Sequence, residues 1–65
     1  MNYVVQQMTL KEKFDLGVQD PEFSQVMYKV VRVSSGRVVD YLISNKKVAQ
    51  EVAETFQAEE DYEID

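Results

Sequence analysis

The sequence predicts a small α+β domain, in which a short antiparallel sheet is covered on one face by a helix near the C-terminus. Three observations favour this fold class. Apolar residues recur at helical spacing within 45–58, two β-branched runs flank a glycine turn within 26–43, and residues 3–8 suit a short strand. Because an isolated hairpin is only marginally stable in water, we expect the helix to cover the sheet and residues 3–8 or 9–18 to supply a possible N-terminal strand.

The helix is the clearest of these elements. Its apolar positions form one stripe, whereas glutamine and glutamate occupy the opposite face. Ser44 or Asn45 precedes the stripe as a suitable N-cap. The stripe ends before Glu59, so residues 1–58 are predicted to form a single domain and 59–65 a flexible acidic tail. The residues of the stripe are Val48, Ala49, Val52, Ala53 and Phe56.

The predicted hairpin has a competitor. Valine, isoleucine and tyrosine dominate both sides of Ser34-Ser35-Gly36, and a glycine at the end of a three-residue loop is typical of a hairpin. However, Asp20-Pro21-Glu22 is also a good helix start, and the apolar residues of 23–31 fit helical spacing. If residues 20–32 were helical, the protein would be a small all-α helical bundle. The valine-rich composition and the turn favour the hairpin.

Residues 9–18 fit two structures. Thr9 and Glu12 form a capping box and Gly17 stands where a helix often ends, which favours a short helix over 10–16. Alternating apolar residues from Met8 to Val18 would instead suit a strand. The sequence leaves this choice open.

The composition excludes several kinds of site. The 65 residues include no cysteine and no histidine, so disulfides, thiolate sites and the usual histidine zinc sites are excluded. Two glycines are too few for a glycine-rich phosphate loop. Nothing in the sequence pairs a nucleophile with a base. We therefore predict no enzyme activity, no metal and no cofactor.

The charges are strongly polarised along the chain. Residues 1–50 carry seven basic and five acidic side chains, whereas 51–65 carry seven acidic side chains and no basic one, within a formal net charge of −5. The predicted helix therefore begins with Lys46 and Lys47 and ends in acids, which is the reverse of what the helix dipole favours. A chain that keeps this order is expected to use the charges in an interaction.

These features predict a non-enzymatic, acidic protein–protein interaction module. Its contact is expected in the acidic tail, where Tyr62 and Ile64 are apolar anchors among carboxylates that would attract a basic partner surface. The small size and polarised charge fit a regulator or inhibitor of a host protein, encoded by a phage or mobile element. Without an apolar stretch for a signal peptide or a membrane span, the protein is expected to be cytoplasmic and to contact no membrane. The predicted partner-binding residues are Glu59, Glu60, Asp61, Tyr62, Glu63, Ile64 and Asp65.

Two alternative functions rank below this one. A small nucleic-acid-binding regulator would use the basic residues of the hairpin and helix start, although such residues more often protect sheet edges from aggregation. A homo-oligomeric accessory subunit of a larger, virion-like assembly is the other alternative. In a homodimer, two antiparallel helices would place Lys46 and Lys47 beside Glu59 and Glu60 of the other copy. The candidate phosphate-contacting residues are Lys29, Arg32, Arg37, Lys46 and Lys47.

Overall fold

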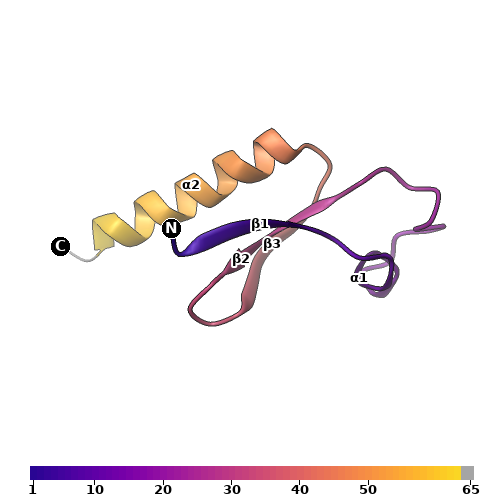
Figure 1. Ribbon diagram of the computed structural model, residues 1–65, viewed down its shortest axis with the longest axis horizontal. Helices are drawn as coiled ribbons and strands as arrows, with labels where there is room; N and C mark the ends of the chain where they lie inside the picture. The colour runs from indigo at the N-terminus through magenta and orange to yellow at the C-terminus, as the bar shows by residue number, and fades with distance from the viewer. Residues whose placement is uncertain (64–65) are drawn as a thin grey trace.

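The computed structural model describes residues 1–63 and has two layers, a three-stranded antiparallel sheet and a long helix that covers one of its faces (Figure 1). A short helix lies beyond the end of the sheet, and the long helix packs mainly over the first two strands. The predicted α+β class is confirmed, and the all-α alternative is wrong. In chain order the elements are β1 (Tyr3–Gln7), α1 (Leu10–Asp15), β2 (Tyr28–Arg32), β3 (Arg37–Ile43) and α2 (Lys46–Glu63).

The hairpin forms because β2 is the central strand of the sheet. It pairs with β1 on one side and β3 on the other, so its valine-rich backbone finds partners along both edges. Residues 20–27 are turn and irregular structure, and the competing helix over 20–32 does not form. At the hairpin turn Gly36 has a φ of 70°, a left-handed angle that favours glycine, and its N–H donates to the Arg32 carbonyl at 2.8 Å.

β3 carries two irregularities that lengthen it relative to β2. One extra residue would turn every following side chain to the wrong face of the sheet, whereas two restore the alternation. Ile43 therefore packs against the core, and its neighbour Leu42 takes a φ of 58°. The register pairs that define these bulges are Val31 with Val38, Val30 with Asp40, and Tyr28 with Ile43.

The open choice at residues 9–18 is settled by α1. The Thr9 hydroxyl accepts from the Glu12 N–H at 3.1 Å, and the Glu12 carboxylate accepts from the Thr9 N–H at 3.0 Å, so the predicted capping box is present. Gly17 follows the helix with a φ of 90°. The N–H groups of Gly17 and Val18 donate back to carbonyls in the last turn, which is the Schellman ending that a glycine permits.

α2 begins where predicted and ends later. Asn45 is its N-cap, because the side-chain oxygen accepts from the Lys47 N–H at 2.8 Å. The helix runs through Glu63, beyond the predicted end at residue 58. Its last turns are held to the sheet by Glu60, whose carboxylate contacts Asn2 and Arg32. Residues 64 and 65 lie outside the described residues.

The core between the sheet and α2 is small. Tyr3, Val30, Ala49 and Ala53 form its buried cluster. The two alanines let α2 approach the strands closely, since a methyl group takes little space. The Tyr3 ring stacks against Phe56 with 5.5 Å between ring centroids and 25° between ring planes. These contacts fix the position of α2 above β1 and β2.

Candidate interaction surfaces

The helix divides the described side chains of the acidic segment, at residues 59–62, into inward and outward ones. Glu60 points towards the sheet, where Oε1 accepts from the Asn2 side-chain amide at 2.9 Å and lies 3.5 Å from an Arg32 nitrogen. Tyr62, the predicted anchor, is 84% exposed. The side chain of Glu63 and residues 64–65 lie outside the described part of the chain. Glu60 therefore links the end of α2 to Asn2 and Arg32, whereas Tyr62 is exposed to solvent.

The environment of Glu60 also changes its acidity. A hydrogen bond from the Tyr3 hydroxyl, followed by one from Asn2, holds the pKa of Glu60 below its ordinary value of 4.5. The positive charge of Arg32 acts in the same direction, and desolvation opposes it. Asn2 contacts α2 a second time, because its backbone N–H donates to the Gln57 side chain at 2.7 Å. A partner that recruited Glu60 would have to break these contacts.

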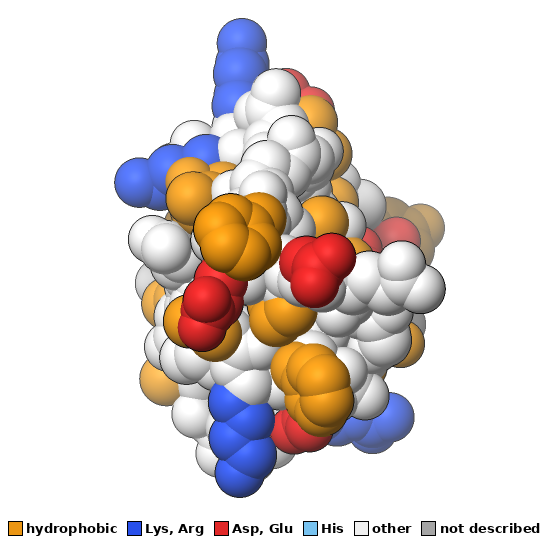
Figure 2. Space-filling model, turned by 90° about the vertical axis from the view of Figure 1, so that its right-hand side faces the viewer, with side chains coloured by type: hydrophobic (Ala, Val, Ile, Leu, Met, Phe, Trp, Pro, Cys, Tyr) orange, Lys and Arg blue, Asp and Glu red, His pale blue; other side chains and the backbone are white. Residues whose placement is uncertain are grey.

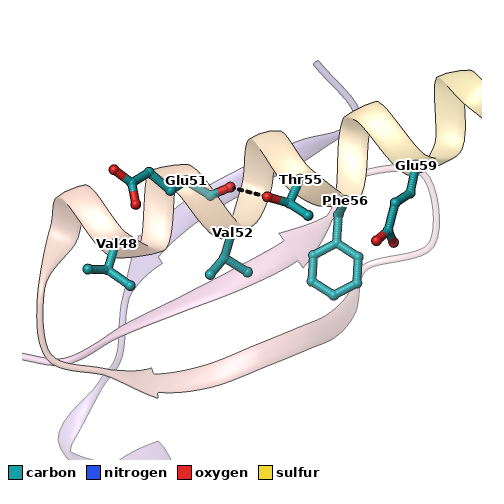
Figure 3. Close-up of a pocket in the computed structure, with 6 residues that line it drawn as sticks. All are labelled: Val48, Glu51, Val52, Thr55, Phe56 and Glu59. Atoms are coloured by element: carbon teal, nitrogen blue, oxygen red, sulfur yellow. Dashed lines mark hydrogen bonds between the residues drawn. The ribbon is translucent and has the colours of Figure 1, made fainter.

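The flank of α2 nearest β3 is an apolar groove with acidic sides. Figure 3 shows Val48, Val52 and Phe56 projecting from α2 on this flank, with Glu51 and Glu59 beside them. Val52 and Phe56 pack against the core, whereas Val48 is 45% exposed. Of these three apolar side chains, Val52 and Phe56 therefore belong to the core and Val48 to the surface.

The basic residues predicted to contact phosphate do not form one patch. Lys29 and Arg32 each pair with a carboxylate, and their spacing of three residues places them on opposite faces of β2. Arg37 stands beside the hairpin turn, whereas Lys46 and Lys47 begin α2 after the other end of β3. This distribution weakens the nucleic-acid interpretation.

A surface that the sequence analysis missed lies at the α1 end of the molecule. Leu10, Phe14, Phe23 and Val26 are 51%, 69%, 88% and 46% exposed, and we call these four residues the α1-end surface. Figure 2 shows this end of the molecule, where hydrophobic side chains and carboxylates share the centre and Lys or Arg side chains lie at the margins. Phe14 also lines a groove formed with residues 17–21.

The backbone below the α1-end surface is tied down by a buried lysine. Lys13 is 5% exposed, and its Nζ donates to the Ser24 hydroxyl at 3.0 Å and to the Gln25 carbonyl at 3.5 Å. The Ser24 hydroxyl in turn donates to the Pro21 carbonyl at 3.0 Å. A buried ammonium group is tolerated only when it is hydrogen-bonded. These bonds join α1 to the loop that carries Phe23, so the exposed aromatic rings stand on an ordered support.

Two signals in the sequence point to this surface in retrospect. Phe23 has polar residues on both sides, and it belongs to no apolar stripe once the helix over 20–32 is excluded. Leu10 and Phe14 lie one turn apart on α1, and no other element of the described chain covers them.

Other kinds of site receive no support from the described residues. Acidic side chains do not gather there in the groups of three that could hold a metal ion. Neither described helix combines the length and apolar content needed to cross a membrane. Comparison of the chain with protein-family models, with curated proteins and with solved structures finds no match in any of the three.

Proposed function

We propose that this chain is a non-enzymatic protein-binding module that contacts its partner through the α1-end surface. The observation that supports this proposal is the exposure of Phe14 and Phe23 on a hydrogen-bonded support. Clustered exposed apolar side chains mark interaction sites more often than isolated ones do. Aromatic anchors that enter a pocket on the partner contribute much of the binding free energy at such sites.

The charges around this surface indicate the chemistry of the partner. Asp15, Asp20 and Glu22 are exposed in the same segment and outnumber its one exposed base, Lys11. The charge of Lys13 is used in internal hydrogen bonds. A protein with apolar pockets inside a basic rim would match both the rings and the carboxylates. A nucleic acid would meet repulsion between its phosphates and these acids.

The acidic segment 59–65 is a second contact in this proposal, with Tyr62 as its exposed anchor. Figure 1 places residues 59–63, the described part of this segment, at the opposite end of the molecule from α1. The finer predictions extend the same proposal: the module regulates or inhibits a host protein, is encoded by a phage or mobile element, and acts in the cytoplasm. Small size and acidity support them.

The double variant Phe14→Ala, Phe23→Ala tests the proposal. Both rings are exposed, so the variant should keep the circular dichroism and melting temperature of the parent. Partners are captured by cross-linking in the producing cells, and binding of the identified partner is then measured by calorimetry. Loss of a hot-spot side chain costs about 2 kcal/mol, so we expect affinity to fall at least about thirtyfold.

Tyr62→Ala tests the second contact separately, because it removes an exposed ring from the other end of the molecule. Retained affinity in this variant and lost affinity in the double variant would assign the contact to the α1-end surface. The reverse result would assign it to the acidic segment. Unchanged affinity in all of these variants would contradict both contacts.

A further inference from the structure

β1 is an outer strand that lacks the usual protection against pairing with another chain. Its sequence, Tyr3-Val4-Val5-Gln6-Gln7, has no charged residue and no proline, and its register with β2 is continuous. The other outer strand, β3, is bulged twice and carries Arg37 and Asp40. Charges, prolines and bulges are the common devices that block sheet edges. β1 therefore offers a straight, uncharged edge.

The hydrogen bonds at the two ends of β1 show which backbone groups face this edge. The Asn2 carbonyl accepts from the Val33 N–H at 2.7 Å, and the Met8 N–H donates to the Met27 carbonyl at 2.8 Å. Along an antiparallel strand, the N–H and C=O groups of successive residues point alternately to one side and the other. Because Asn2 and Met8 bond towards β2, the backbone groups of Val4 and Gln6 between them are also directed towards β2. The N–H and C=O groups of Val5 and Gln7 are consequently directed outwards.

A groove follows the same edge, between β1 and the flank of α2 that carries Lys46, Gln50 and Glu54. Each of these exposed residues follows the previous one by four positions, so the three lie in one line along the helix. The line has a positive end, a neutral centre and a negative end. A second helix with the same line would match it only in the antiparallel direction.

We propose that the groove is occupied by a second copy of this chain, which pairs with β1 in an antiparallel register about a two-fold axis at Gln6. Val5 of each copy then lies opposite Gln7 of the other. The two sheets join into one, and both α2 helices lie on the same face of it. Because α2 packs over β1 and β2, the helix axes would be about 10 Å apart, as packed helices require.

The same two-fold axis brings opposite charges of the two α2 helices together. It places Lys46 of each copy near Glu54 of the other, with the two Gln50 side chains between them. The order of charges that opposes the dipole of a single helix is thus favourable between two antiparallel helices. This pairing replaces the contact with Glu60 expected from the sequence, because Glu60 is engaged with Asn2 and Arg32.

The size of the surface also favours a second copy. A compact monomer of 7.6 kDa exposes about 4300 Å², whereas this chain exposes 4848 Å². Its radius of gyration is 12.8 Å, against about 10.7 Å for a compact chain of this length. A standard interface removes about 800 Å² from each partner. The chain therefore has surface to bury, and its small core gains stability from association.

Gln7→Pro is the first test, measured by sedimentation equilibrium up to about 1 mM. Proline removes an outward N–H from an exposed edge position and leaves the bonds to β2 intact. We expect the parent to dimerise and the variant to raise the dimer Kd roughly a hundredfold. Gln7→Thr, which keeps the N–H, is the control and should dimerise. Circular dichroism verifies that both variants fold.

A charge exchange on α2 is the second test. Lys46→Glu alone and Glu54→Lys alone should each raise the dimer Kd about tenfold, because like charges then face each other across the axis. The double variant Lys46→Glu, Glu54→Lys should restore the dimer Kd of the parent to within about threefold, because opposite charges then face each other again. In a mixture of labelled and unlabelled chains, NMR should detect contacts between Val5 of one copy and Gln7 of the other.

Three results would overturn the proposal. One is a monomer at every concentration. Another is a dimer that survives Gln7→Pro and fails to respond to the charge exchange. The third is a dimer that is lost with Phe23→Ala but kept with Gln7→Pro, which would place the contact on the α1-end surface.

Discussion

The Glu60 carboxylate is the residue-level link between α2 and β1. Its pKa lies below 4.5 in the folded chain, because Tyr3 and Asn2 hydrogen-bond to the charged form and Arg32 faces it. The stability that this provides is complete above a pH of about 4.5 and is lost as the pH falls through the lower folded-state value. The pKa of Glu12 is also lowered, chiefly by its hydrogen bond with Lys29. The stability that Glu12 provides is therefore lost in the same way as the pH falls.

Glu60→Gln should therefore lower stability at pH 7 and reduce the loss of stability between pH 5 and 3 (approximate limits set by the ordinary carboxyl value). The amide can still accept from Asn2, but it carries no charge for Arg32. The measurement is the urea midpoint as a function of pH for the parent and the variant. Glu59→Gln controls for the loss of one negative charge, and equal pH slopes in the two variants would contradict the role given to Glu60.

At the residue scale the sequence predicts the capping residues of α1 but not the burial of Lys13. Thr9, Glu12 and Gly17 have local signatures, because each capping bond joins residues a few positions apart. Lys13 carries no such signature. Its burial depends on Ser24 and Gln25, which reach it only when the loop folds back over α1. Glu60 was likewise assigned to a partner, because its contacts with Asn2 and Arg32 are distant in sequence.

At the scale of elements, α2 shows how tertiary packing overrides a local preference. Its first turn contains no acid and its last turn no base, and each misplaced charge costs about 0.3–1 kcal/mol at low salt. Burial of Ala49 and Ala53 and the stacking of Phe56 on Tyr3 hold the helix regardless. The N-cap bond of Asn45 adds to this.

Lys47→Glu should accordingly stabilise the fold, by about 0.3–1 kcal/mol at low salt. Lys47 is exposed and lies beside the N-cap, so the new carboxylate would face the positive end of the helix dipole. Urea unfolding measured at low salt and at about 1 M salt, where the screening length is about 3 Å, checks the cause. A gain that persists at high salt would show that the dipole is not its source.

The sequence predicts α2 and the hairpin because each has a periodic pattern long enough to read alone. It does not predict the end of α2, because residues 59–63 lack an apolar stripe and are held by Glu60 instead. It also leaves residues 20–32 ambiguous. Residues 28–32 form a strand and not a helix because β2 pairs with β1, which lies more than twenty residues away along the chain.

At the scale of the whole molecule, α2 covers one face of the sheet whereas the opposite face is only partly buried, and this asymmetry predicts different responses to the same substitution. Val30 is fully buried under α2, whereas Val38 is 39% exposed on the opposite face. Val30→Ala should cost about 2 kcal/mol, which is a large part of the roughly 3–5 kcal/mol that such a small core supplies. Val38→Ala should change the free energy of unfolding by less than about 0.5 kcal/mol.

Denaturant unfolding of the two variants measures this difference at equal chain concentration. Equal losses would mean that Val38 on the face opposite α2 is buried in solution, and would point to a contact across that face. A loss confined to Val30→Ala agrees with association through the edge of the sheet, which leaves that face open.

The bulges of β3 have a consequence for the size of any assembly. Two copies joined at β1 would present only their β3 strands to the outside, and these strands are bent twice and do not offer an even ladder of N–H and C=O groups. A chain with two straight edges would add further copies without limit and form fibres. In the proposed dimer the irregular strand would thus end growth at a closed pair, so the feature that keeps Ile43 facing the core would also set the number of chains.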